Sequence, residues 1–311
     1  FTLSNCTTKT SILFKRIDKT SENIGFDLIF DGKKNTSFRP KIIKFFSMIQ
    51  EYCPYLKDYH LLISSSNSFP HSSGIASSAS SMSALSLCIM SLEKKLTLID
   101  DVYFFKKASF ISRIGSGSAS RSVYGGVNFW GKHKELNNSS DLYSVKLCKN
   151  ISPKFNNYRD VILIIDDKEK EVSSSVGHGL MNDNPFSKVR FNAANNNITK
   201  LLQILSSGNL NDFCELVESE ALMLHSLMMN SNPSYILMKP ETLKVIERIQ
   251  DFRENSKIPV CFTLDAGANV HVLFPENFSK EVMTFIDKEL AHLCKGGKFI
   301  TDSIGEGPKQ F

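Results

Sequence analysis

Hydrophobic and polar residues follow strand-like and helix-like spacings in turn along the first half of the chain. Thr10–Ile17 and Ile24–Phe30 alternate apolar and polar side chains, which predicts two strands. Pro40–Glu51 carries apolar residues at helical spacing, with proline near its start, which predicts a helix. Further elements are predicted as strands at His60–Ser64, Gly126–Trp130 and Asp141–Leu147, as helices at Ile75–Leu92 and Asp100–Ile111, and as a serine-dense loop at Ser64–Ser73.

The second half of the chain is predicted to contain more helices than the first. Val161–Ile165 is a continuous apolar run, which is typical of a central strand buried on both faces. Predicted helices follow at Ser173–Met181, Phe186–Leu205, Asn211–Met229, Thr242–Arg253 and Lys280–Leu293, and predicted strands at Val260–Leu264, Val270–Phe274 and Lys298–Thr301. A strand-rich half followed by a helix-rich half with returning strands predicts an α+β fold of two lobes, residues 1–170 and 171–311.

Composition narrows the class of protein. The chain has 311 residues, of which 41% are hydrophobic and 22% charged, with a net charge of +5. This mild basic excess suits an anionic small-molecule substrate, and no basic run with interleaved aromatics points to nucleic acid. The apolar runs are too short to span a bilayer, and no secretory signal opens the chain. Seven scattered cysteines without metal-site spacing predict reduced thiols and a cytoplasmic protein.

The first motif runs from Ser68 to Ala79, between a predicted strand and a predicted helix. Its proline fixes the entry of the chain, its glycine lets backbone approach a ligand, and the helix N-terminus attracts anions. First-turn hydroxyls can reach a phosphate or its Mg²⁺. The candidate phosphate-binding residues are Ser68, Pro70, Ser72, Ser73, Gly74, Ala76, Ser77 and Ser78, with Ser78 the candidate for magnesium. The alternative interpretation is a serine-rich loop with a capped helix.

The second motif, Arg113–Gly126, combines small residues, two hydroxyls and an arginine. The hydroxyls of Ser116 and Ser118 can donate hydrogen bonds to a diphosphate, and Arg121 can pair with a carboxylate through two nitrogens. The alternative is a Gly/Ser turn with a surface arginine. The single tryptophan, Trp130, is interpreted as a structural residue.

The third motif places Asp265 at the end of a buried strand, directly before Ala-Gly. Such a carboxylate faces a cleft and is a candidate catalytic acid or base, although a strand-end aspartate is more often a turn or cap residue. His225 lies among apolar residues at helical spacing and is interpreted as a core or cleft-wall histidine.

Together the three motifs resemble a known family. The segments Gly74-Ile75-Ala76-Ser77-Ser78-Ala79, Gly115–Gly126 and Asp265-Ala266-Gly267-Ala268-Asn269 are similar, in order and spacing, to those of diphosphomevalonate decarboxylases. That family belongs to the galactokinase, homoserine kinase and mevalonate kinase (GHMP) superfamily. The resemblance implies a two-lobed small-molecule kinase fold, with an N-terminal lobe like that of a ribosomal protein and a ferredoxin-like C-terminal lobe.

The resemblance also implies a reaction and roles. ATP and Mg²⁺ would drive decarboxylation of diphosphomevalonate to isopentenyl diphosphate in isoprenoid biosynthesis. Asp265 would be the catalytic acid/base, Arg121 would orient the carboxylate, and Ser116 and Ser118 would bind the substrate. A further substrate contact falls on either Ser173 or Ser174, and the family commonly forms homodimers.

Two other functions stay open from the sequence. One is a related kinase that phosphorylates mevalonate or its phosphate without decarboxylation, and the other is a non-catalytic metabolite-binding regulator on the same fold. The family's opening Lys-Tyr-Trp-Gly-Lys-like segment has no counterpart here, and Phe1-Thr2-Leu3 is typical of the middle of a strand. We therefore expect further residues upstream of Phe1.

Overall fold

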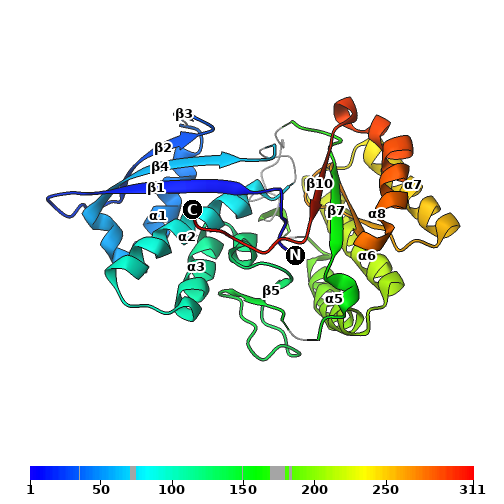
Figure 1. The fold of residues 1–311 in the computed structure, drawn as a ribbon, viewed down its shortest axis with the longest axis horizontal. Coiled ribbons are helices and arrows are strands. Elements are labelled where there is room, and N and C mark those ends of the chain that lie inside the picture. Colours follow the sequence, from blue (N-terminus) through cyan, green and yellow to red (C-terminus); the bar gives the residue numbers. More distant parts are fainter. Residues whose placement is uncertain (35, 71–74, 149, 169–178, 182–183) are drawn as a thin grey trace. The chain divides into compact units, whose positions relative to one another are not determined.

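The computed structural model describes residues 1–311 except 35, 71–74, 149, 169–178 and 182–183. The chain divides into two compact units (Figure 1). The first unit comprises Phe1–Phe69, Ser77–Lys146 and Gly305–Phe311, and the second comprises Pro70–Ala76 and Leu147–Ile304. The predicted lobe boundary near residue 170 stays a prediction, because compactness does not test where independently folding domains end.

A four-stranded sheet forms one layer of the first unit. Its strands are β1 (Thr8–Arg16), β2 (Gly25–Phe30), β3 (Lys33–Lys34) and β4 (Tyr59–Asn67), in the order β1-β4-β2-β3. β4 pairs antiparallel with β1 and parallel with β2. Burial alternates along β1 because successive side chains point to opposite faces, and only one face meets the core.

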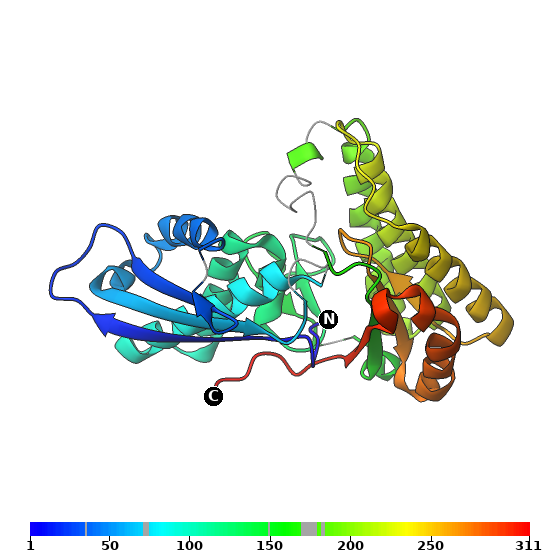
Figure 2. The same ribbon diagram turned by 90° about the horizontal axis from the view of Figure 1, so that it is seen from above.

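Helices cover that face of the sheet, as the labelled view and the view from above show (Figures 1 and 2). They are α1 (Arg39–Ile49), α2 (Ser77–Leu96) and α3 (Asp101–Gly115), accompanied by a short 3-10 turn, η1 (Pro54–Asp58). Their apolar stripes bury Phe45, Met82 and Ile111 against Phe26 and Leu61 of the strands. A second 3-10 segment, η2 (Gly117–Val123), follows α3 and precedes the strand pair β5 (Asn128–Trp130) and β6 (Ser144–Lys146).

Of the boundaries in the first unit that differ from the prediction, two have an identifiable structural cause. α2 begins at Ser77 and not at Ile75, because Ala76 has a φ of 51° and left-handed backbone cannot continue a right-handed helix. β4 extends to Asn67, through four residues predicted as loop, because side chains pair across the strands. The hydroxyls of Thr10 and Ser65 lie 2.9 Å apart, and Thr8 donates to Asn67 at 2.8 Å.

The second unit is built around an antiparallel sheet of order β10-β7-β9-β8. Its strands are β7 (Tyr158–Leu163), β8 (Cys261–Thr263), β9 (Val270–Pro275) and β10 (Phe299–Ser303), and its long helices are α5 (Ser187–Ser207), α6 (Leu210–Met229) and α7 (Pro240–Ser256). Val161 and Val272 pack with α7 on one face, whereas Tyr158 and Leu273 pack with α5 and α6 on the other. The prediction of an interior strand at 161–165 is therefore confirmed, with β7 between β10 and β9.

The prediction of one regular α-helix at Lys280–Leu293 is wrong. α8 (Ser279–Phe285) passes into a π turn, η5 (Ile286–Leu290), and then a 3-10 turn, η6 (Ala291–Leu293). Ile286 and Leu290 are both fully buried, so the wider turn keeps the two side chains in the core. Short 3-10 turns also occur at η3 (Pro153–Phe155), η4 (Glu276–Phe278) and η7 (Lys295–Gly297). Residues 173–178 of the predicted helix Ser173–Met181 lie outside the described residues.

In the described part of the chain, no helix combines the length and the apolar character that a bilayer span requires.

Candidate active site

The N-terminus of α2 is the predicted phosphate site. The helix runs for 20 residues from Ser77, so its first-turn N–H groups and dipole favour an anion. Ser77 is buried and Ser78 is half-buried, whereas Pro70 and Ala76 are exposed. The other predicted members, Ser72, Ser73 and Gly74, lie outside the described residues.

Lys41 is a candidate that the sequence prediction missed. Its ammonium donates a hydrogen bond of 2.5 Å to the hydroxyl of Ser78, which brings a cation to the first turn of α2. Desolvation lowers the pKa of the Lys41 amine from its ordinary value. One signal was present in the sequence, because a cation in the first turn of a helix such as α1 opposes the helix dipole.

The hydroxyl of Ser68 forms hydrogen bonds with backbone groups of the first unit. It donates to the carbonyl oxygen of Asn5 at 2.6 Å and accepts from the N–H of Thr7 at 2.9 Å. These contacts tie the end of β4 to the segment before β1. The prediction that Ser68 also binds phosphate stays untested.

The second motif lies on the α3 terminus and η2. Ser116 ends α3, Ser118 and Arg121 lie on η2, and α2 packs against η2 within the same unit. Ser116 and Ser118 are half-buried and Arg121 is exposed. Gly115 has no room for a side chain, since a Cβ there would lie 2.6 Å from the sulfur of Met82 on α2. The glycine at position 115 therefore allows the second motif to approach α2, whose N-terminus is the predicted phosphate site.

Three fully buried serines form hydrogen bonds that hold η2 in place. Ser109 of α3 and Ser144 of β6 donate to the carbonyl oxygen of Ser120 at 2.8 and 2.6 Å. Ser120 in turn donates to the carbonyl oxygen of Gly117 at 2.9 Å. Because each buried hydroxyl is satisfied, the cluster adds rigidity without an unpaired polar group.

The end of the second motif packs directly against the last residues of the chain. The N–H of Gly126 donates to the carbonyl oxygen of Gly305 at 2.9 Å, and the N–H of Gly305 donates to Thr2 at 2.7 Å. A Cβ on Gly125 would lie 1.8 Å from the carbonyl oxygen of Glu306, so only glycine fits there.

Asp265 lies on the loop that follows β8 of the second unit and is exposed. One of its carboxylate oxygens accepts from the N–H of Ala266 at 2.7 Å. The Nε2 of His225 on α6, a residue only 2% exposed, lies 3.1 Å from the backbone oxygen of Asp265. The interpretation of His225 as a core or cleft-wall histidine is consistent with this position, and its hydrogen bond fixes the turn that carries Asp265.

The rest of the third motif anchors the same turn. Asn269 is buried, and its side-chain oxygen accepts from the N–H groups of Ile165 and Asp166 at 2.7 and 2.9 Å. The hydroxyl of Thr242 on α7 donates to the carbonyl oxygen of Ala268 at 2.8 Å. The loop between β8 and β9 is thus held at both ends, which orients its one exposed carboxylate.

A histidine–aspartate pair lies on the neighbouring strands β9 and β7 of the same unit. His271 Nδ1 is 2.8 Å from a carboxylate oxygen of Asp160. Burial lowers the pKa of His271, but Asp160, Asp265 and Asp302 raise it, and the net pKa lies above its ordinary value. Periodicity could not reveal this pair, because 111 positions separate the two residues.

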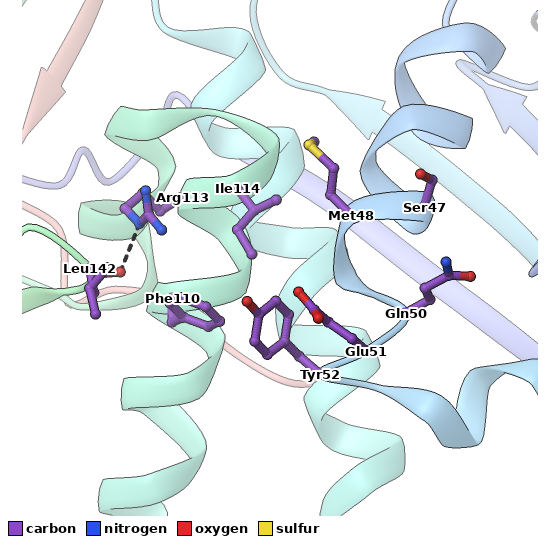
Figure 3. A pocket seen from close by; sticks show the side chains of 9 residues that line it. All are labelled: Ser47, Met48, Gln50, Glu51, Tyr52, Phe110, Arg113, Ile114 and Leu142. Atoms are coloured by element: carbon purple, nitrogen blue, oxygen red, sulfur yellow. Dashed lines mark hydrogen bonds between the residues drawn. The ribbon is translucent and has the colours of Figure 1, made fainter.

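A pocket of about 810 Å³ lies elsewhere in the first unit (Figure 3). The C-terminal ends of α1 and α3 contribute to its lining, and Figure 3 shows Tyr52 and Phe110 side by side. None of the predicted site residues lines it. The guanidinium of Arg113 closes one end by donating to the carbonyl oxygen of Leu142 at 2.9 Å.

Ser173 and Ser174 lie outside the described residues. Among the residues that the structure does describe, no group of three or more His, Cys, Asp or Glu side chains could hold a metal ion. A magnesium ion carried by nucleotide phosphates needs no such cage, and the hydroxyl of Ser78 at the α2 N-terminus suits that role.

Two family models together match nearly the whole chain. Residues 1–142 match the diphosphomevalonate decarboxylase-like N-terminal domain, and residues 160–309 match the mevalonate 5-diphosphate decarboxylase C-terminal domain. A diphosphomevalonate decarboxylase of Ganoderma lucidum is 27% identical over 244 residues, which are 76% of this chain and 58% of the relative. The chain therefore spans less than two thirds of that relative's length.

Solved structures agree with this match. The mevalonate diphosphate decarboxylase of Staphylococcus aureus superposes with a TM-score of 0.81 at 25% identity, covering 98% of this chain and 86% of that one. The protein named MDDEF, in complex with MVAPP, AMPPCP and magnesium, gives a TM-score of 0.81 at 24% identity, covering 98% and 87%, which supports the fold.

The α+β fold and the three ordered motifs define a member of the two-lobed small-molecule kinase superfamily. Within it, the chain belongs to the diphosphomevalonate decarboxylase family.

Proposed function

We propose that this chain catalyses the ATP-dependent decarboxylation of diphosphomevalonate to isopentenyl diphosphate, with release of ADP, phosphate and CO₂. The observation that carries the proposal is the exposed carboxylate of Asp265 on a turn held by His225 and Asn269. Asp265 stands where the motif of the family has its acid/base, and a hydrogen bond from the N–H of Ala266 holds its exposed carboxylate.

The γ-phosphoryl group of ATP would pass to the tertiary hydroxyl of the substrate, whose proton Asp265 accepts. Phosphorylation makes a poor leaving group into a good one. When phosphate departs with the C–O bonding electrons, the electrons of the bond to the carboxylate form the new double bond and CO₂ leaves. Arg121 would orient that carboxylate, and Ser116 and Ser118 would hold the diphosphate.

ATP and Mg²⁺ belong to the same proposal. The α2 N-terminus, the hydroxyls of Ser77 and Ser78, and the ammonium of Lys41 would hold the nucleotide phosphates. Bound magnesium would neutralise charge on the transferring phosphoryl group. The structure of MDDEF with an ATP analogue and magnesium supports this assignment for a protein of the same fold.

The test is to mix the protein with ATP, Mg²⁺ and diphosphomevalonate and to follow ADP and CO₂ together. Equal amounts of ADP and CO₂ are expected. ADP without CO₂ would replace the proposal by a kinase that stops at the phosphorylated product. Neither product, from a chain that includes the residues upstream of Phe1, would favour a metabolite-binding regulator.

The expected cytoplasmic location and homodimer stay proposals alongside the activity. Seven scattered cysteines without metal-site spacing support the first. Light scattering of the purified protein tests the second, and a mass of one chain, 34.9 kDa, would contradict it.

A further inference from the structure

The single tryptophan of the chain packs against the second motif. Trp130 ends β5 and is 37% exposed. A Cβ added to Gly117 would lie 2.8 Å from Cη2 and 3.3 Å from Cζ3 of its indole. The ring therefore lies directly against the backbone between Ser116 and Ser118, and a side chain at position 117 would require the indole to shift.

The indole is itself held in place. Its N–H donates to the carbonyl oxygen of Asp141 at 3.0 Å. Trp130 also pairs with Ser144 across the two strands, and Ser144 donates to the carbonyl oxygen of Ser120 on η2 at 2.6 Å. The strand pair β5–β6 thus contacts η2 twice, through the ring at Gly117 and through a buried hydrogen bond at Ser120.

We infer that Trp130 is a positioning residue for the site of an organic diphosphate formed by Ser116 and Ser118. The inference rests on the proposed function, because that function assigns the diphosphate to these two hydroxyls. The ring prevents the Gly117 peptide from moving toward β5, so the spacing of the two hydroxyls is set before the ligand arrives. Pre-set geometry of this kind improves affinity by lowering the entropy cost of binding.

Fluorescence gives a readout, since Trp130 is the only tryptophan among these 311 residues, and the emission lost in Trp130→Phe identifies its signal in a longer chain. Diphosphomevalonate, and inorganic pyrophosphate as a headgroup probe, should each change the tryptophan emission in a saturable way. The dissociation constants should match those from calorimetry. Unchanged calorimetric affinity of Trp130→Ala for diphosphomevalonate would overturn the inference and leave the proposed function intact. Failure of both calorimetric binding and turnover would overturn the proposed function, and the inference with it.

Variants separate positioning from general stability. Trp130→Ala should raise KM for diphosphomevalonate about tenfold, with KM for ATP unchanged, and Trp130→Phe should restore most of the affinity because a ring remains against Gly117. Phe191→Ala removes an aromatic ring that is 52% exposed on α5 and serves as the matched control, expected to behave as the unaltered chain.

A double variant tests the contact itself. Gly117→Ala alone should impair substrate affinity, because the new methyl group meets the indole. Adding it to Trp130→Ala should cost little more, since the ring is no longer there. Additive losses, or equal rises of KM for both substrates, would contradict the inference.

Discussion

The ammonium of Lys41 donates a hydrogen bond to the hydroxyl of Ser78, so a cation from α1 lies at the first turn of α2. A phosphate bound there would take this ammonium as a charged partner, which is worth about 1.5–3 kcal/mol. Lys41→Met should therefore weaken ATP binding by about ten- to a hundredfold, as measured by calorimetry. Lys44→Met, on the same helix and exposed, is the control and should leave the affinity unchanged. Equal affinities of the two variants would remove Lys41 from the nucleotide site.

Removal of the carboxylate at the β8–β9 loop should stop the chemistry while binding persists. Asp265→Asn keeps the shape of the side chain but cannot accept the substrate proton. We expect kcat to fall by at least about a hundredfold, with the affinity for ATP unchanged. Asp287→Asn exchanges another exposed carboxylate of the second unit and should retain full turnover. Normal turnover by Asp265→Asn would contradict the proposed mechanism.

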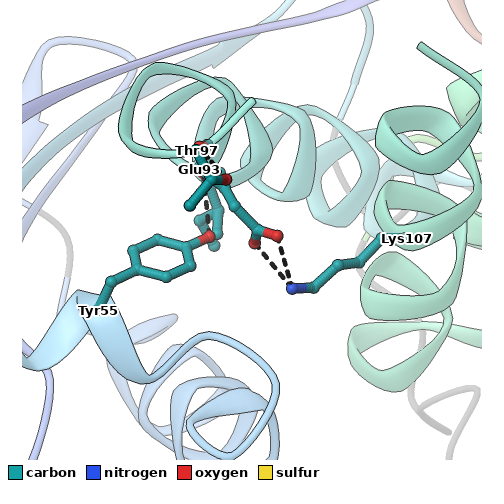
Figure 4. A network of polar contacts seen from close by, with 5 residues as sticks. Tyr55, Glu93, Thr97 and Lys107 are labelled. Atoms are coloured by element: carbon teal, nitrogen blue, oxygen red, sulfur yellow. Dashed lines mark hydrogen bonds and ion pairs between the residues drawn. The ribbon is translucent and has the colours of Figure 1, made fainter. Parts of the chain in front are cut away.

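A buried ion pair joins α2 to α3 in the first unit (Figure 4). Lys107 Nζ lies 2.8 Å from both carboxylate oxygens of Glu93, and the two side chains are 17% and 9% exposed. Lys107→Met leaves Glu93 charged and buried, so it should lower the free energy of unfolding by about 3–5 kcal/mol. Lys107→Met combined with Glu93→Leu should be less damaging than Lys107→Met alone. Denaturant titration of both variants checks this, and a double variant that is the less stable would refute it.

The left-handed backbone of Ala76 predicts a stabilising substitution. Ala76→Gly removes the steric conflict of a Cβ at a φ of 51°, which should raise the free energy of unfolding by about 1 kcal/mol. The same exchange inside α2, Ala84→Gly, should lower it by about 0.5–1 kcal/mol. Thermal unfolding of the two variants should thus shift in opposite directions, and a loss of stability in both would show that position 76 is unstrained.

His271 and Asp160 should make stability depend on pH. The pKa of His271 is raised in the folded state, despite burial, by Asp160, Asp265 and Asp302. Its contribution is therefore fully present below the ordinary value of about 6.5 and is lost as pH rises through the folded pKa. Asp160→Asn removes the nearest carboxylate, so its deficit in unfolding free energy should be larger at low pH and shrink as pH rises. A constant deficit across this window would indicate a neutral His271.

Periodicity predicted most of the fold, because helices and strands with one buried face repeat at fixed spacings. Asn211–Met229 coincides closely with α6 for this reason, and Val161–Ile165 overlaps β7 at residues 161–163. The start of α2 was missed because it depends on the conformation of Ala76, which composition does not encode. The serines at the end of β4 were predicted as loop because their strand pairing depends on partners in β1.

The candidate site likewise has parts that the sequence predicted and parts that only the structure shows. The three motifs could be found from residue types at short spacing, and the resemblance supplied their proposed roles. The contacts of Lys41 with Ser78, Trp130 with Gly117 and His225 with Asp265 join residues far apart in the chain. No local pattern marks such pairs, so Trp130 and His225 could be interpreted only as structural residues.

The backbone contacts of Gly305 with Thr2 and Gly126 have a consequence for biosynthesis. They belong to the first unit, yet one partner is translated only after the whole of residues 147–304. On the ribosome, the second unit can fold as soon as it emerges, whereas the first must wait with its glycine contacts unmade. A chaperone that binds nascent chains would therefore meet the amino-terminal half of this protein, not residues 147–304, in an unfinished state.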